Sequence, residues 1–168
     1  KENCDLDCLP NSFLSQGGQL YDIQMDTNPF TFVPIGPSYD EQFGYTGAQY
    51  NGLGFNPVDG YLYAMRQGSG VGKILLKIHP ATGVIQELGE VSGIVQAAYL
   101  NGDFDESGNY YIKAGNINGM WKVDVVNLTA TPIFFSPAGN YNSSDFPYNI
   151  KDCLLYASRS ISGQGTQL

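Results

Sequence analysis

The sequence predicts an all-β fold, a propeller-like stack of about three blade-type repeats that is incomplete or open at its ends. A recurring unit, alternating apolar residues and a turn-rich composition each predict it. The unit consists of a short strand such as Leu20-Tyr21-Asp22-Ile23, a turn, and an aromatic hairpin that ends in tyrosine. The equivalent tyrosines Tyr63, Tyr111 and Tyr156 follow one another at steps of 48 and 45 residues. This is the spacing of propeller blades that are built from several short strands.

Local pattern and composition favour strands over helices. Apolar residues alternate with polar ones, as at Leu76 and Ile78, so each strand has one apolar face. The dipeptides Asp59-Gly60 and Ser107-Gly108 place turn residues between apolar runs. The 168 residues include 21 Gly and 9 Pro, with 13% aromatic and 14% charged residues. That composition is typical of a turn-rich β-protein of one domain, and no amphipathic helix is predicted.

The elements follow in a simple order. A cysteine-containing lead of residues 1–19 ends in a first strand, three repeats follow at 20–66, 75–115 and 120–159, and residues 160–168 form a polar tail. The first strand, Ser12–Gly17, is similar to the closing strand of a unit, Leu62–Gly68. The chain therefore begins with the end of one unit.

Three units and one extra strand fall short of the roughly four to eight blades of a closed propeller. An open stack leaves unpaired strand edges, which pair readily with another chain. Three outcomes fit: the chain is a fragment of a longer protein, the units close in a smaller way, or neighbouring subunits complete each other's sheets by strand addition.

Charge and sequons favour an extracellular or cell-surface location. Lys and Arg total 8 against 16 Asp and Glu, a net charge of −8. Asn127-Leu128-Thr129 and Asn142-Ser143-Ser144 are glycosylation sequons in expected loops, so Asn127 and Asn142 are candidate attachment sites. The acidic balance argues against a nucleic-acid partner, which requires a basic stripe. No apolar run is long enough for a membrane span.

Cys4, Cys8 and Cys153 are the disulfide candidates. A bridge from Cys4 or Cys8 to Cys153 ties the two ends of the chain together and leaves one thiol over. A Cys4–Cys8 pair and an intermolecular disulfide are the alternatives. His79 is the only histidine, and with no second close cysteine pair these residues do not predict a metal site.

Several segments together resemble a known family. They are Phe13–Gln16, Gln19–Ile23, Tyr50–Tyr63, Ile78–Gly83 and Leu88-Gly89, and they are similar to a secreted β-propeller-like repeat domain of unknown function found in surface and adhesin-type proteins. The resemblance covers Phe13 to Tyr111 and weakens afterwards, where Asp152-Cys153 replaces the usual Asp-Gly turn. It implies an extracellular scaffold and brings no catalytic residues. The chain is also shorter than a complete member, which favours assembly or truncation.

Candidate sites for ligands are few. Asp103, Asp105 and Ser107 imitate the start of a calcium loop, but its twelfth position is Ala114 where a bidentate acid is required, so a hairpin turn is the alternative. Tyr39, Tyr45, Tyr50 and Tyr99 offer rings that could stack on sugars, or pack in the core or at a subunit interface. No cofactor is predicted.

Two functions of different class follow. The first is a non-enzymatic extracellular structural protein, glycosylated, that associates with copies of itself through its open terminal strands, as in a fibre. The alternative is a lectin-like carbohydrate-binding or adhesion module that recognises glycans through aromatic residues. A glycan-active enzyme ranks third, because nothing in the sequence shows that two carboxylates converge.

Overall fold

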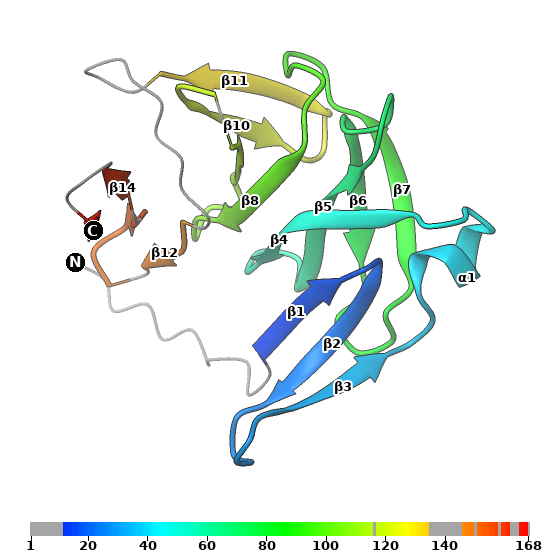
Figure 1. The fold of residues 1–168 in the computed structure, drawn as a ribbon. Coiled ribbons are helices and arrows are strands. Elements are labelled where there is room, and N and C mark those ends of the chain that lie inside the picture. The colour runs from blue at the N-terminus through cyan, green and yellow to red at the C-terminus, as the bar shows by residue number, and fades with distance from the viewer. Residues whose placement is uncertain are drawn as a thin grey trace.

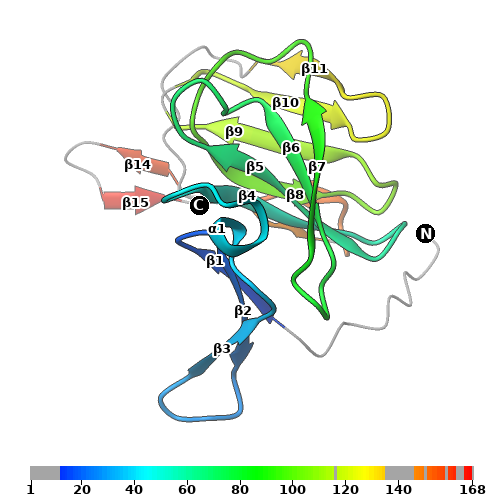
Figure 2. The same ribbon diagram turned by 90° about the vertical axis from the view of Figure 1, so that its right-hand side faces the viewer.

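The computed structural model describes residues 12–115, 117–134, 146–149, 151–157, 159–161 and 165–167. It confirms the predicted all-β class. Its strands form antiparallel sheets, and the first sheet projects away from the second and third (Figures 1 and 2).

The strands fall into three larger sheets and two short hairpins. The first sheet is β1 (Ser12–Gln16), β2 (Gln19–Gln24) and β3 (Thr31–Ile35). The second is β4 (Gln49–Asn56), β5 (Tyr61–Gln67), β6 (Ile74–Ile78) and β7 (Ile85–Glu90). The third is β8 (Tyr99–Phe104), β9 (Tyr110–Ala114), β10 (Met120–Asp124) and β11 (Thr129–Ile133). The hairpins are β12 (Tyr148–Asn149) with β13 (Leu154–Leu155), and β14 (Arg159–Ile161) with β15 (Gly165–Gln167).

The boundaries of the sheets differ from those of the predicted repeats. The unit expected at 20–66 contains β2 and β3 of the first sheet together with β4 and β5 of the second. A sequence period measures the distance between equivalent strands, whereas hydrogen bonding decides where one sheet stops and the next begins. The segment 20–66 therefore joins two sheets rather than forming one.

Strand register shows which strands are equivalent. Leu14 pairs with Tyr21 in the first sheet, Ala64 with Leu76 in the second, and Ile112 with Trp121 in the third. In each case the hairpin is followed by one further strand at the outer edge. So β1 corresponds to β5 and β9, and within the described residues the first sheet has no strand in the position of β4 or β8.

Two apolar clusters hold the sheets together. Alternate residues of β5 point into different clusters, Leu62 and Ala64 towards the first sheet, Tyr63 and Met65 towards the third. All four are buried. Because successive side chains of a strand point to opposite faces, the second sheet is buried on both sides. Each large side chain buried in this way contributes about 1.5–3 kcal/mol to folding.

We call β4–β7 the second unit, β8–β11 the third and β12–β13 the fourth. The first hairpin turns of these units share one construction. In each, an aspartate accepts a hydrogen bond from the hydroxyl of a tyrosine on the following segment. The pairs are Asp59 with Tyr63 (2.7 Å), Asp105 with Tyr111 (3.1 Å) and Asp152 with Tyr156 (2.5 Å). The turn also needs one left-handed residue, and these are Gly60, Gly108 and Cys153, with φ of 75°, 79° and 60°. The replacement of glycine by Cys153 keeps the geometry of the turn.

The structure contains one short helix that the sequence analysis did not predict. A helix of five residues, α1 (Tyr39–Phe43), connects the first sheet to the second. Ser38 and Glu41 form a capping box at its start, and Gly44, with φ 69°, ends it. Five residues are too few to show a helical period in the sequence. The described chain has no helix long or apolar enough to cross a membrane.

Helix α1 fixes the second sheet to the segment that enters it. The side chain of Gln42 donates to the carbonyl oxygen of Gly83 (3.0 Å) and accepts from the amide of Ile85 (2.7 Å). These bonds place the helix against the start of β7. They orient the first sheet relative to the second.

Candidate interaction surface on the first sheet

The inner strands of the second and third sheets touch through their backbones. A Cβ on Gly54 would lie 3.0 Å from the Cα of Asp103, and a Cβ on Gly102 would collide with the carbonyl oxygen of Gly52. The fully buried Tyr110 donates its hydroxyl hydrogen to that same carbonyl oxygen. Burial raises the pKa of Tyr110 well above its ordinary value, so its hydroxyl stays a donor. β4 and β8 therefore form a tight junction.

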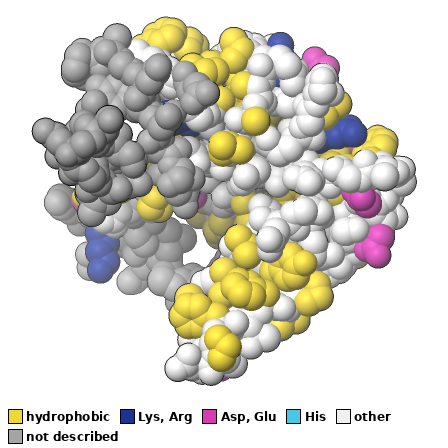
Figure 3. Space-filling model, viewed as in Figure 1, with side chains coloured by type: hydrophobic (Ala, Val, Ile, Leu, Met, Phe, Trp, Pro, Cys, Tyr) yellow, Lys and Arg dark blue, Asp and Glu magenta, His cyan; other side chains and the backbone are white. Residues whose placement is uncertain are grey.

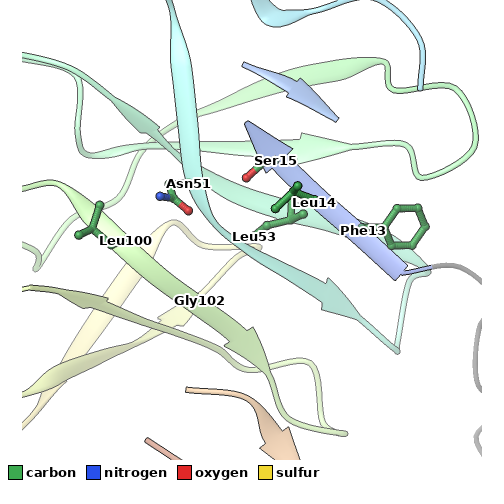
Figure 4. A pocket seen from close by; sticks show the side chains of 7 residues that line it. All are labelled: Phe13, Leu14, Ser15, Asn51, Leu53, Leu100 and Gly102. Carbon is green, nitrogen blue, oxygen red and sulfur yellow. The ribbon is translucent and has the colours of Figure 1, made fainter. Parts of the chain in front are cut away.

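A pocket opens where β1 meets these two strands. Its volume is about 390 Å³, and Phe13, Leu14, Ser15, Asn51, Leu53, Leu100 and Gly102 line it (Figure 4). Ser15 and Asn51 supply its polar groups, and none of the lining side chains titrates. The pocket offers an apolar wall and a few hydrogen-bonding groups rather than an acid, a base or a charged nucleophile.

The edge of β1 beside this pocket is open. β1 is paired with β2 along one edge, and among the residues the structure describes no strand pairs with its other edge. In the second and third sheets the equivalent edge is filled by β4 and β8. An open edge exposes backbone donors and acceptors that can accept another strand.

One face of the first sheet, here called the outer face, is opposite to the face that packs in the cluster shared with the second sheet. Residues directly opposite each other across antiparallel strands share a face. Register places five apolar residues on it: Leu14, Tyr21, Ile23, Phe32 and Pro34. Phe13, Leu20 and Ile35 belong to the opposite face, in the cluster shared with the second sheet. The polar residues Ser12, Gln16 and Gln19 also lie on the outer face, towards the ends of β1 and β2.

Exposure separates this face from its equivalents. Ile23 pairs with Phe32, as Ile78 pairs with Ile85 and Val123 with Ala130. The exposed fraction is 50% for Phe32 but 6% for Ile85, which packs in the cluster between the first and second sheets, and Ala130 is partly buried. Apolar side chains gather over the first sheet in the lower part of Figure 3. Phe32 is therefore more exposed than the residues at the same position of the other two sheets.

The four candidate tyrosines lie mostly in the core. Tyr39, Tyr50 and Tyr99 have exposed fractions of 0%, 3% and 0%, so burial rules them out as faces for stacking on a sugar. Burial raises the pKa of Tyr99 to about 12. Tyr45 is the exception, with an exposed fraction of 37%.

Tyr45 belongs to a cluster around Arg66. The guanidinium carbon lies 4.2 Å from the ring centroid of Tyr45, and the ring also stacks on Phe43. Arg66 pairs with Glu87 at 3.3 Å, and Glu87 accepts a hydrogen bond from the hydroxyl of Tyr39. Burial, followed by that hydrogen bond, raises the pKa of Tyr39 far above its ordinary value. The cluster ties α1 and its flanking loop to β5 and β7.

The calcium-like segment behaves as a hairpin turn. Asp105 accepts from the amides of Ser107 (3.0 Å) and Asn109 (2.9 Å) and from the side chain of Asn109 (2.7 Å). Asp103 instead accepts a hydrogen bond of 2.7 Å from the amide of Tyr148, a residue of β12. The two carboxylates thus serve different partners. The described part of the chain holds no group of three or more His, Cys, Asp or Glu residues placed to bind a metal.

The remaining candidates are only partly described. Cys153 is an exposed, free thiol whose Sγ lies 3.6 Å from Glu106 Oε1. Asn127 is exposed in a turn, where its side-chain nitrogen donates to Asp124 (2.8 Å). Cys4, Cys8 and Asn142 lie outside the described residues, so the disulfide pairing and the second sequon stay predictions.

Sequence reasoning missed the outer face, although a signal for it exists. Residues 31–35 read Thr-Phe-Val-Pro-Ile and residues 129–133 read Thr-Ala-Thr-Pro-Ile. The structure gives both the same place, because Tyr21 pairs with Pro34 as Trp121 pairs with Pro132. Aligning these two segments places Phe32 at the position of Ala130, which is partly buried against the core.

Comparisons with solved structures agree with this architecture. A gluconolactonase from Xanthomonas campestris is similar over 84% of the chain and 42% of its own length, with 15% identity and a TM-score of 0.54. A virginiamycin B lyase from Staphylococcus aureus is similar over 94% of the chain and 50% of its own length, with 13% identity and a TM-score of 0.53. Both are β-propeller-type proteins, so the chain spans at most half the length of either. At this identity the likeness shows the fold alone.

No curated protein matches the chain in sequence. One family does match, over residues 11–167, and it is described as a repeat of unknown function (DUF6923). The match begins next to β1 and extends through β15. The chain therefore belongs to this family of repeats of unknown function.

Proposed function

We propose that this chain is a non-enzymatic, extracellular structural module that associates with copies of itself through its first sheet. The outer face carries the proposal. Its Phe32 is half exposed, whereas Ile85, at the same position of the second sheet, is buried. Burying such a face against a partner removes apolar surface from water, which stabilises the complex by about 25 cal/mol per Å².

The open edge of β1 supports the same conclusion. It borders the pocket that Leu14 and Leu53 line, so an incoming strand would find both backbone hydrogen-bonding groups and apolar side chains. Strand addition uses this combination, with affinity from the main chain and specificity from alternate side chains. An association through open terminal strands would use this edge.

The use of the acidic side chains supports a role without catalysis. Asp59, Asp105 and Asp152 hold turns, and Glu87 holds Arg66 and Tyr39. A carboxylate whose lone pairs are occupied by several donors is poorly placed to act as a general acid or base. The gluconolactonase and the lyase share the fold, which hosts many functions.

The extracellular part of the proposal rests on charge and on Asn127. The net charge of −8 suits an acidic, soluble surface, and Asn127 is exposed in a turn as a glycan acceptor must be. We infer glycosylation at Asn127 in a secretory pathway.

Sedimentation velocity of the chain over a hundredfold range of concentration tests self-association. We expect the mean mass to rise with concentration, with and without reductant, because the first sheet needs no disulfide. Monomers at every concentration would contradict the proposal. A mass that collapses only on reduction would move the joint from the first sheet to the cysteines.

A further inference from the structure

We propose that a pocket on the third sheet holds the first sugar ring of a glycan attached to Asn127. This inference rests on the proposed glycosylation of Asn127 and gives the attached sugar a binding site. Every lining residue that the structure describes lies in the segment 107–131, in the interior of the chain.

The pocket lies between the β8–β9 turn and the hairpin of β10 and β11. Its volume is about 430 Å³, which falls within the range of about 300–1,000 Å³ that is usual for small-molecule sites. Its polar groups include those of Asn109, Lys122, Asp124 and Thr131, and Val126 adds apolar surface. A sugar ring suits this mixture, because its hydroxyls need hydrogen-bonding partners and its C–H groups pack on apolar side chains.

The second sheet shows what normally fills this position. There the rings of Tyr61 and His79 lie against each other, with centroids 5.5 Å apart. Lys77 Nζ lies 4.0 Å from the ring centroid of Tyr61. The second sheet thus closes the position with its own side-chain rings.

The third sheet lacks both rings. Lys122 is the equivalent of the lysine in the second sheet, because each pairs with the tyrosine that follows the first hairpin turn. The same register puts Asn109 in the place of Tyr61, and Asp124 in the place of His79. Two short polar side chains therefore stand where the second sheet has two rings, and the pocket lies at that position.

The lysine of the third sheet has donors to spare. Lys77 Nζ lies 2.9 Å from a carboxylate oxygen of Asp59 in the second sheet. In the part of the chain that the structure describes, Lys122 forms no ion pair. The equivalent carboxylate, Asp105, accepts from the amide and the side chain of Asn109 instead. The Lys122 ammonium group is thus available to donate to a hydroxyl of a bound sugar.

Asn127 lies beside the pocket and can deliver a sugar to it. Its side-chain nitrogen donates to Asp124 at 2.8 Å, and Asp124, Val126 and Thr129 all line the pocket. Glycosylation joins this nitrogen to C1 of an N-acetylglucosamine, whose lipid diphosphate carrier leaves. The nitrogen loses one of its two hydrogens as a proton and keeps the other. The retained N–H can still donate to Asp124, so the attached sugar begins at the edge of the pocket.

An unattached glycan offers the same ring chemistry, but the attachment favours the glycan of Asn127. A short tether holds its ligand at an effective concentration of about a millimolar or more. A pocket with weak intrinsic affinity is therefore filled by the attached sugar before a free one.

Two reciprocal substitutions test the pocket. Asn109→Tyr gives the third sheet the ring that the second sheet has and fills the pocket. Tyr61→Asn removes that ring from the second sheet and is the control, because it leaves the pocket unchanged. Should Asn109→Tyr fail to fold, Lys122→Ala removes the available donor without adding a ring. All chains carry Asn142→Gln, so that the second sequon adds no glycan.

The chains are secreted from a eukaryotic host and trimmed with an endoglycosidase to one N-acetylglucosamine. Each is compared in urea unfolding with its Asn127→Gln counterpart, which carries no sugar. We expect the sugar to lower the unfolding equilibrium constant about tenfold in the original chain and in Tyr61→Asn, as one or two hydrogen bonds would, and less than about twofold in Asn109→Tyr. Nuclear Overhauser contacts from the sugar to the methyl groups of Val126 and Thr131 should be present in the original chain and absent in Asn109→Tyr.

The outcomes distinguish this inference from the proposed glycosylation. An unmodified Asn127 in secreted protein would overturn both. A sugar on Asn127 that stabilises Asn109→Tyr as much as the original chain, or stabilises neither, would overturn the pocket assignment and leave glycosylation standing. Micromolar binding of free chitobiose to Asn127→Gln, lost when Asn109→Tyr is added, would assign the pocket to an external glycan and overturn the attached arrangement.

Discussion

Cys153 adopts the left-handed backbone conformation in the fourth unit that Gly108 adopts in the third, with φ of 60° and 79°. Both residues lie in the turn that joins the first two strands of their unit. A Cβ is strained in this conformation, whereas glycine is not. The fourth unit therefore keeps the turn at a cost in backbone strain.

Replacing this cysteine by glycine is expected to stabilise the chain. Cys153→Gly should raise the free energy of unfolding by about 1 kcal/mol, because the strain of a left-handed residue with a side chain is relieved. Urea unfolding measures the change, with Cys153→Ser as the control that keeps a Cβ. Equal stability of the two variants would show that the turn is not strained.

The buried hydroxyl of Tyr110 is expected to matter more than that of Tyr111. Tyr110→Phe leaves the carbonyl oxygen of Gly52 without its donor in the core and should destabilise the chain by about 1–3 kcal/mol. Tyr111→Phe removes a partly exposed bond to Asp105 and should cost less than about 1 kcal/mol. The difference between the two unfolding free energies checks the prediction. A reversed order would mean that the β4–β8 junction does not depend on this bond.

Stability should fall in acid, in part through Asp59. Partial burial alone would raise its pKa, but hydrogen bonds from Lys77, Tyr63 and the amide of Tyr61 hold the pKa below the ordinary value of an aspartate. Because the folded pKa is the lower one, this contribution is present above about pH 4 and is lost as the pH falls through the folded pKa. Asp59→Asn should reduce the loss of unfolding free energy in acid by less than about 1 kcal/mol, because the pair with Lys77 is near the surface. The slope of the unfolding free energy against pH, measured between pH 2 and pH 6, checks the prediction. An identical slope in the variant would assign the acid sensitivity to other carboxylates.

Tyr45 separates the structural role from the lectin-like alternative. Tyr45→Ala removes the contact with Arg66 and should lower the free energy of unfolding by about 0.5–1 kcal/mol. Tyr61→Ala is the control, because Lys77 Nζ lies 4.0 Å from its ring centroid in a similar contact elsewhere. We expect no specific signal from the unmodified chain on a glycan array. A bound glycan that Tyr45→Ala loses and Tyr61→Ala retains would establish the lectin-like function instead.

Asn127 should carry a glycan when the chain passes through a secretory pathway. Intact mass spectrometry of material secreted from a eukaryotic host should show a mass that Asn127→Gln reduces by one glycan, whereas Asp124→Ala, which releases the side chain of Asn127, keeps it. An unmodified Asn127 in secreted protein would exclude this site.

Local signals in the sequence were enough to predict the strands and turns. The alternation at Leu76 and Ile78 and the turn at Asp59-Gly60 each depend on neighbouring residues, and both occur as expected. Helix α1 escaped prediction because one helical turn has no period, although Ser38 and Glu41 spell its capping box.

The candidate surfaces were harder to predict, because they depend on which sheet covers which. Tyr39 and Tyr45 are six residues apart in similar surroundings, yet one is fully buried and the other is 37% exposed. Tyrosine suits both places, so its identity does not decide between them. Phe32 is a comparable case, since its exposure follows from the absence of a described sheet in front of β2 and β3 rather than from its neighbours along the chain.

The glycine contacts between β4 and β8 also limit how repeats can be added to such a protein. Gly54 and Gly102 allow two inner strands to approach closely, and any side chain there would drive the second and third sheets apart. The junction between β1 and β4 has Leu14 and Leu53 instead and leaves a pocket. A tandem duplication of one unit would reproduce the tight spacing only where the glycines are copied with it. The spacing between neighbouring inner strands is therefore set separately at each junction, by the residues that meet there.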